Sequence, residues 1–171
     1  VWSQFVTQLL IVAAVEEKEP TAIDCAYHHK EMVFIPIDAI DVLSWKSGVT
    51  TFFKLPKIAW LIFKAMYQAD HIHLRCPGNI GLIGCIMQIL FPFKPKTAKY
   101  AGNWNPKAKQ PWSYRLQKWL LSNPFLTRNM QVLVYGEWEG SSKNIHPFFT
   151  ATYWETEKAP LKPLNFATTI R

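Results

Sequence analysis

A long central part of this sequence contains no acidic residue. Between Asp70 and Glu137 neither aspartate nor glutamate occurs, whereas lysine and arginine occur nine times. The chain of 171 residues carries a formal charge of +7 at pH 7, so its excess positive charge falls in this stretch. Such a stretch predicts a positive surface, whose natural partners are phosphates of nucleic acid, of an anionic membrane or of a phosphorylated substrate. The alternative is a solvated basic face that has no specific ligand.

Cysteine and long apolar runs are also scarce. The three cysteines, Cys25, Cys76 and Cys85, are too few and too scattered for a disulfide framework, and a reducing, cytoplasmic setting fits them best. No apolar run reaches the roughly 18 residues of a membrane-spanning helix. No basic segment precedes the first apolar run, as it would in a signal peptide. We therefore predict a globular, cytoplasmic protein, which agrees with a hydrophobic content of 49%.

Short apolar runs alternate with amphipathic stretches along the chain, which is typical of βαβ units. We therefore expect an α/β, Rossmann-like fold, in which helices flank a mostly parallel sheet. Strands are predicted at residues 9–15, 32–37, 72–76, 97–101, 131–135 and 148–153. Helices are predicted at residues 58–69 with Pro56 in the first turn, along an apolar stripe at residues 82–90, and after Pro111.

The first candidate site is the junction between the predicted strand 72–76 and the helix that follows it. In parallel α/β sheets the ligand lies beyond the carboxyl ends of the strands, where helices begin. Gly78 and Gly81 would let a ligand approach the backbone, and a helix start at Asn79 would offer N–H groups to an anion. Arg75 could add a forked donor for a phosphate or a sugar hydroxyl. The glycine spacing is not G-x-G-x-x-G, which argues against a nicotinamide site.

Two histidines precede this junction. His71 and His73 are two residues apart on a strand, so both imidazoles face one side, and Cys76 lies nearby in sequence. This spacing could hold a metal ion. A dedicated third ligand is not apparent, so core or substrate-contacting histidines are the favoured interpretation, and we predict no metal site.

The second candidate site follows the predicted strand 97–101. Gly102 permits close approach, Asn103 can hydrogen-bond hydroxyl groups through both halves of its amide, and Trp104 offers an aromatic face on which a sugar can stack. The alternative is an ordinary loop with a packing tryptophan.

The residues of these two junctions resemble the N-terminal domain of bacterial family 4 glycosyltransferases. These are GT-B enzymes that are often encoded in polysaccharide or cell-envelope glycan gene clusters. The resemblance lies in Ala-Asp-His-Ile-His-Leu-Arg-Cys-Pro-Gly-Asn-Ile-Gly at residues 69–81 and in Lys-Tyr-Ala-Gly-Asn-Trp at residues 99–104. It extends over most of the chain, from about residue 2 to about residue 156.

The resemblance implies two Rossmann-like halves facing a cleft, of which this chain is the acceptor-side half. Residues 1–158 would form that domain without its first strand and phosphate loop, which would precede Val1. Residues 159–171 would begin a linker toward a half that holds the nucleotide-sugar donor. Many family members carry a histidine, contacting the donor sugar, where this sequence has Asn103-Trp104. Both ends are thus expected to be truncated, and the fragment alone is expected to be inactive.

The implied chemistry is transfer of a glycosyl group from a nucleotide diphosphate sugar to an acceptor hydroxyl. It needs neither metal nor cofactor, because helix dipoles and basic side chains offset the charge of the leaving diphosphate. Acceptors in such families are often lipid-linked pyrophosphates, which implies peripheral contact with the inner membrane face. No catalytic residue is identified. The residues expected to bind substrate are Arg75, Gly78, Asn79, Gly81, Asn103 and Trp104.

Two other classes of function compete with this interpretation. A nucleic-acid-binding module would explain the basic, aromatic-rich stretch, and it predicts salt-sensitive binding and a sheet face with exposed aromatics. The aromatics on the predicted strands lie in apolar runs, which favours burial, so we expect no nucleic-acid partner. An interaction domain with no chemistry of its own is the second alternative.

Overall fold

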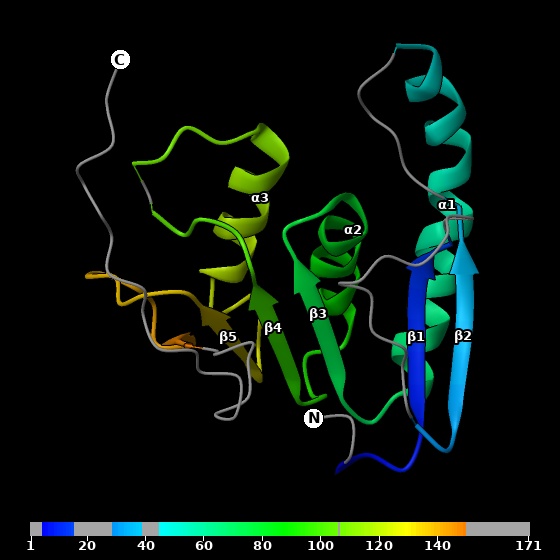
Figure 1. Ribbon diagram of the computed structural model, residues 1–171, viewed down its shortest axis with the longest axis horizontal. Helices are drawn as coiled ribbons and strands as arrows, with labels where there is room; N and C mark the ends of the chain where they lie inside the picture. The colour runs from blue at the N-terminus through cyan, green and yellow to red at the C-terminus, as the bar shows by residue number, and fades with distance from the viewer. Residues whose placement is uncertain (1–4, 16–28, 39–44, 106, 150–171) are drawn as a thin grey trace, which may run out of the picture.

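The structure is a computed structural model that describes residues 5–15, 29–38, 45–105 and 107–149, with side chains in the first helix described from residue 53. All strands in these residues are parallel within their sheets and point in one direction (Figure 1). A two-stranded sheet holds β1 (Leu9–Ala14) and β2 (Met32–Ile37). A four-stranded sheet holds, in spatial order, β3 (Ile72–Cys76), β4 (Lys96–Tyr100), β5 (Met130–Val134) and β6 (Ile145–Pro147).

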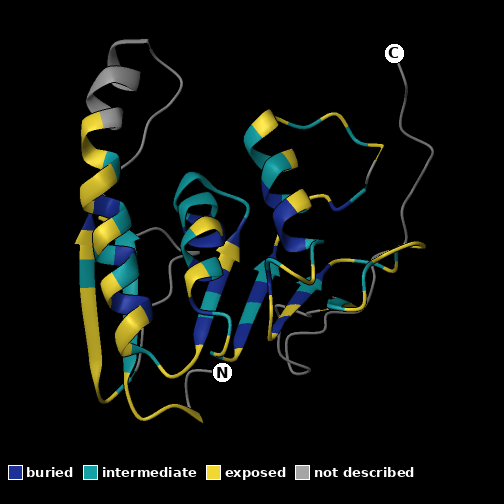
Figure 2. Cartoon of the chain, turned by 180° about the vertical axis from the view of Figure 1, so that it is seen from behind, coloured by how far each residue is buried: buried dark blue, intermediate teal, exposed yellow. Residues whose placement is uncertain are grey.

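Three helices lie together on one side of these sheets, as Figure 2 shows from behind. They are α1 (Trp45–Gln68), α2 (Asn79–Met87), which runs into the 3-10 turn Gln88–Leu90, and α3 (Trp112–Leu121). α1 packs on β1, β2 and α2, and α2 also packs on α3. The predicted α/β, Rossmann-like fold, with a parallel sheet flanked by helices, is therefore confirmed.

Alternation along the strands gives the four-stranded sheet two unlike faces. On β4, Lys96, Ala98 and Tyr100 are buried, while Thr97 and Lys99 between them are partly exposed. β3 alternates in the same way, and its Leu74 and Cys76 face α2. We call the side under α1–α3 the helix-covered face. The other side, which carries His73, Arg75, Thr97 and Lys99, has no helix on it in the described residues, and we call it the helix-free face.

In Figure 1 the pair β1 and β2 stands apart from β3, and the described residues contain no hydrogen-bonded pairing between β1 and β3. The chain runs outward from β1 to β2, crosses over through α1 to β3, and then runs outward again to β6. This is how the two halves of a doubly wound sheet are arranged about their switch point.

Two predicted elements differ from the structure. Pro56 lies well inside α1 rather than in its first turn. Pro56 itself is exposed, and the helix continues through it while Ile58 and Ile62 pack into the core. The described residues hold a strand at Ile145–Pro147, paired with Val132–Val134, that was not predicted. Of the predicted strand 148–153, residues 148 and 149 are not in a strand, and residues 150–153 lie outside the described part.

The remaining strands start or end within one residue of their predicted positions. Among the helices of the described residues, none has the length and apolar character that crossing a bilayer requires.

Candidate functional site at the carboxyl edge of the sheet

The junction between β3 and α2 presents a helix start toward the carboxyl edge of the sheet. β3 ends at Cys76, the Cys76–Pro77 peptide is cis, and Gly78 is the N-cap residue of α2. The N–H of Gly78 donates to Oε1 of Gln117 in α3, over 3.3 Å. Gly78 has no side chain of its own to cap α2, and the first turn of the helix carries no acid. Apart from the oxygen of Gln117, the positive end of the helix dipole at this edge therefore favours an anion or water.

The two glycines of this junction have different roles. A Cβ at Gly78 would meet no heavy atom within 4 Å, so a ligand has room beside its backbone. A Cβ at Gly81 would lie 2.8 Å from the backbone oxygen of Arg75, and this position is buried. The small size of Gly81 therefore lets α2 pack close to β3; the predicted approach of a ligand at Gly81 stays a prediction.

The loop after β4 lies against the same junction. The N–H of Ala101 donates to the carbonyl of Cys76 over 2.6 Å, and a Cβ at Gly102 would lie 2.9 Å from Cγ of Pro77. Asn103, the next residue, is exposed, and its Oδ1 accepts a hydrogen bond from the N–H of Asn105 at 2.8 Å. Gly78 and Asn79 at the start of α2 and Asn103 on the loop after β4 therefore lie at one edge; that they bind substrate stays a prediction.

Trp104 is only 6% exposed, which favours the packing alternative over an open stacking platform. Its ring meets that of Tyr100 edge-on, with 5.0 Å between centroids. The ammonium of Lys118 lies 5.7 Å from the ring centroid of Trp104 and donates to the carbonyl of Asn105 at 3.0 Å. Trp104 thus holds the loop onto α3.

Arg75 is separated from this group. It precedes Cys76, whose side chain faces α2, so Arg75 points to the helix-free face, where it is exposed. Its partner in strand register is Lys99 on β4. Two cations thus occupy neighbouring positions on one face of the sheet, an arrangement that is unfavourable without an anion nearby.

The histidines belong to the same helix-free face. Nε2 of His71 and Nδ1 of His73 lie 3.0 Å and 2.8 Å from Oγ1 of Thr97. Burial, and then the charges of His71, Lys99 and Arg75, lower the pKa of His73. Cys76 is on the opposite face, with its Sγ 3.6 Å from that of Cys85, so it does not join the histidines. The described residues contain no cluster of three groups that could ligate a metal.

Three cations of the acid-free stretch bind backbone carbonyls instead of forming an open basic surface. Nζ of Lys94 donates to the carbonyls of Met66, Tyr67 and Ala69 at the end of α1. Nζ of the buried Lys96 donates to those of Gln88 and Phe91 at 3.3 Å and 2.9 Å, and burial lowers its pKa to about 8. Lys118 is the third. The predicted positive surface therefore contains fewer of the nine cations than the sequence suggests.

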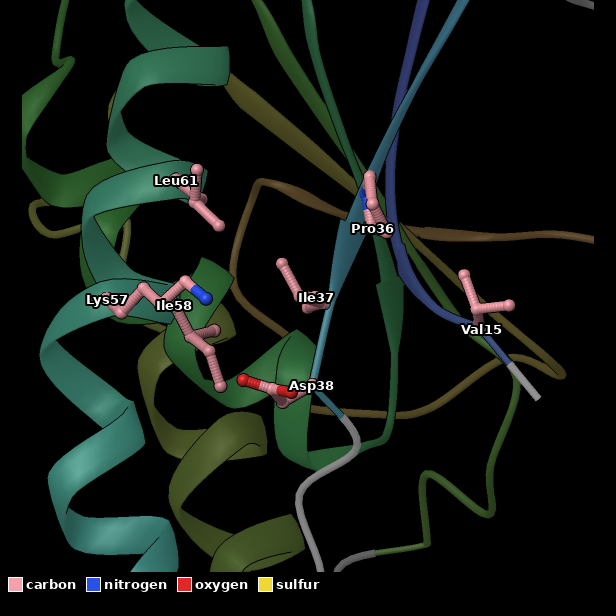
Figure 3. A pocket seen from close by; sticks show the side chains of 7 residues that line it. All are labelled: Val15, Pro36, Ile37, Asp38, Lys57, Ile58 and Leu61. Carbon is pink, nitrogen blue, oxygen red and sulfur yellow. The ribbon is translucent and has the colours of Figure 1, made fainter. Parts of the chain in front are cut away.

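A pocket that the sequence did not reveal lies at the carboxyl ends of β1 and β2, against α1 (Figure 3). Its volume is about 380 Å³, and Asp38 and Lys57 are the polar side chains among the residues that line it. The available signal was an acidic residue directly after the strand Met32–Ile37. The other lining residues are Val15, Pro36, Ile37, Ile58 and Leu61.

The chain was compared with protein-family models, with curated proteins and with solved structures, and none of them matches it significantly.

Proposed function

We propose that this chain is the acceptor-side, Rossmann-like domain of a glycosyltransferase. The enzyme would move a sugar from a nucleotide diphosphate sugar to an acceptor hydroxyl in polysaccharide or cell-envelope glycan synthesis. The observation that carries the proposal is the β3–α2 junction, where a helix start without an acidic first turn, open space beside Gly78 and the exposed Asn103 meet at the carboxyl edge. A helix start attracts the phosphates of a lipid-linked acceptor, and an amide binds its sugar hydroxyls.

The order of the strands also supports the proposal. β1 and β3 do not pair in the described residues and stand apart in Figure 1, which fits a doubly wound sheet with one more strand between them. The resemblance to family 4 glycosyltransferases implies a first strand at that position, followed by a phosphate loop at the same edge. The pocket beside Asp38 and Lys57 lies along this edge as well.

The nucleic-acid alternative receives less support from the strands. Tyr100, an aromatic residue on the four-stranded sheet, is fully buried on the helix-covered face. Stacking platforms for bases need aromatic rings on an open sheet face. Binding of nucleic acid therefore has less physical support than binding of a glycan acceptor.

The proposal is tested by titrating the 171-residue chain with a soluble acceptor analogue, farnesyl pyrophosphate linked to N-acetylglucosamine, by calorimetry. We expect saturable binding, and we expect Gly78→Leu to weaken it about fivefold or more, since a side chain there would fill the ligand's space. We also expect no sugar transfer from a UDP- or GDP-sugar by this chain alone.

The matched control is Ser141→Leu, which adds a side chain of the same size at an exposed position of another loop. Both variants are checked for a native circular dichroism spectrum. Binding that Gly78→Leu leaves unchanged would contradict the proposed site, and the absence of any acceptor binding would contradict the proposed function.

A further inference from the structure

A further concave site lies at the amino edge of the four-stranded sheet. Its volume is about 550 Å³, which is in the range of sites that bind small ligands. Three of its lining residues directly precede a strand: Pro95 before β4, Asn129 before β5 and Asn144 before β6. We call this site the amino-edge groove. Because the four strands are parallel, the groove and the β3–α2 junction lie at opposite ends of the sheet.

Phe93 brings an aromatic ring to the amino-edge groove. This residue is 86% exposed, yet the turn that carries it is tied to the start of β5. Nδ2 of Asn129 donates to the carbonyl of Pro92 at 3.1 Å, and the carbonyl of Asn129 accepts from the N–H of Lys96 at 2.8 Å. An exposed ring on a fixed turn can stack against the C–H face of a sugar.

Three exposed polar side chains of the groove have no hydrogen-bond or ion-pair partner among the described residues. They are Gln131, Lys143 and His146. Gln131 and His146 share the helix-free face, because His146 is in register with Leu133, two residues after Gln131. The amide of Gln131 can donate to one sugar hydroxyl and accept from its neighbour. The ammonium of Lys143 can bind an anionic group.

The loop that carries Lys143 is fixed by the next residue, Asn144. Its Nδ2 donates to the carbonyl of Leu121 at 2.8 Å and to Oγ1 of Thr127 at 3.1 Å. Its Oδ1 accepts from Oγ of Ser142 at 2.8 Å. The backbones on both sides of the groove are therefore held by hydrogen bonds before a ligand arrives, which lowers the cost of ordering them on binding.

The charge of the amino-edge groove selects among possible ligands. The described residues that line it include Lys143 and His146 and no acid, so they favour a ligand with negative charge. They also include no arginine and no helix start, which are the groups that commonly bind phosphate. A nucleic-acid strand needs a row of cations along its phosphates. One lysine beside a histidine matches a carboxylate better than either.

We propose that the amino-edge groove binds an acidic oligosaccharide. One sugar ring stacks on Phe93, its hydroxyls bind Gln131, and the carboxylate of a uronic acid binds Lys143. The inference goes beyond the proposed function and does not rest on it, because the groove shares no residue with the site at the carboxyl edge.

The test is an NMR titration of the ¹⁵N-labelled chain with hyaluronan tetrasaccharide, which contains uronic acid, and with the neutral chitotetraose. We expect saturable binding of the acidic sugar with a Kd below about 1 mM, and binding of the neutral one about fivefold weaker or more. Phe93→Ala should weaken binding of the acidic sugar about fivefold or more, because the stacking surface is lost. Lys143→Gln should weaken it about threefold and remove the preference for the acidic sugar.

The matched control for Phe93→Ala is Phe5→Ala, at a phenylalanine that is also 86% exposed, and Lys109→Gln is the control for Lys143→Gln. Gly78→Leu should bind the tetrasaccharide as the unchanged chain does, which separates this groove from the carboxyl edge. The proposal is overturned if the controls lose as much binding as the groove variants, if Gly78→Leu abolishes binding, or if the chain binds neither sugar. It is also overturned if an oligothymidylate displaces the tetrasaccharide at a lower concentration than free tetrasaccharide does, since the groove would then be a nucleic-acid site.

Discussion

Lys96 and Lys99 stand three residues apart on the same strand and have opposite surroundings. Lys96 is buried on the helix-covered face, and its ammonium donates to two carbonyls. Lys99 is on the helix-free face, where its ammonium lies 4.9 Å from the ring centroid of Phe148 and 5.8 Å from that of Tyr135. In the sequence both belong to the same basic stretch, but one serves the fold and the other remains available to a ligand.

The largest effect should come from the charge of Lys96. Its pKa is lowered to about 8 in the fold, against an ordinary value near 10.4. Between these values the unfolded chain holds a proton that the folded chain has released, so the free energy of unfolding rises with pH. From pH 8 to pH 10 this contribution is on the order of 2–3 kcal/mol.

This contribution is measured as the difference between the chain and its Lys96→Met variant in urea unfolding at each pH. The difference is needed because two other groups make the free energy of unfolding fall in alkali. A hydrogen bond with Cys76, and then burial, raise the pKa of Cys85, and burial raises the pKa of Tyr100 to about 12. If this difference in the free energy of unfolding stays constant from pH 8 to pH 10, the pKa of Lys96 is not lowered by its burial.

A smaller effect should follow the loss of Lys94, which also serves the fold. Its ammonium binds three carbonyls at the end of α1, at 2.6–2.9 Å, where a cation also faces the negative end of the helix dipole. Lys94→Met should lower the free energy of unfolding by about 1–2 kcal/mol. Lys109→Met, at an exposed lysine of the same stretch, should change it by less than about 0.5 kcal/mol. Equal effects of the two variants would remove the distinction between the two groups of cations.

The smallest effect is expected on the helix-free face. Arg75→Gln removes one of two neighbouring cations, so the free energy of unfolding should rise slightly, by about 0.5 kcal/mol or less. The pKa of His73 should rise at the same time, because Arg75 is one of the charges that lower it. A proton NMR titration of the histidine rings measures this shift. An unchanged His73 pKa would mean that the cations of this face do not interact.

The sequence predicted the parts of the fold that depend on local pattern. The strands Met32–Ile37 and Ile72–Cys76 were predicted with their observed bounds, because apolar and β-branched runs between turn residues are a local signal. The start of α2 after Pro77-Gly78 was predicted for the same reason. The extent of α1 was missed, because Pro56 suggested a helix start, whereas packing of the helix on β1, β2 and α2 overrides that signal.

The candidate site was predicted only in part, because its geometry depends on contacts between distant residues. Gly78 and Asn103 lie at one edge, as expected. Whether Trp104 is open or buried depends on Tyr100, Lys118 and α3, and whether Gly81 admits a ligand depends on the backbone of β3. The face to which Arg75 points follows from alternation along its strand, but the sequence does not show which face the helices cover.

The lack of pairing between β1 and β3 bears on how cooperatively the molecule unfolds. Within the described residues the two sheets share no ladder of hydrogen bonds, and α1 packs on β1 and β2 as well as on α2. The units from β3 to β5 follow one another along the chain, so their contacts form at small sequence separation. In the described residues, β1 and β2 are therefore linked to the larger sheet through their packing on α1. They would accordingly form a separate foldon that opens, and exchanges its amide protons, at a lower free energy than β3 and β4.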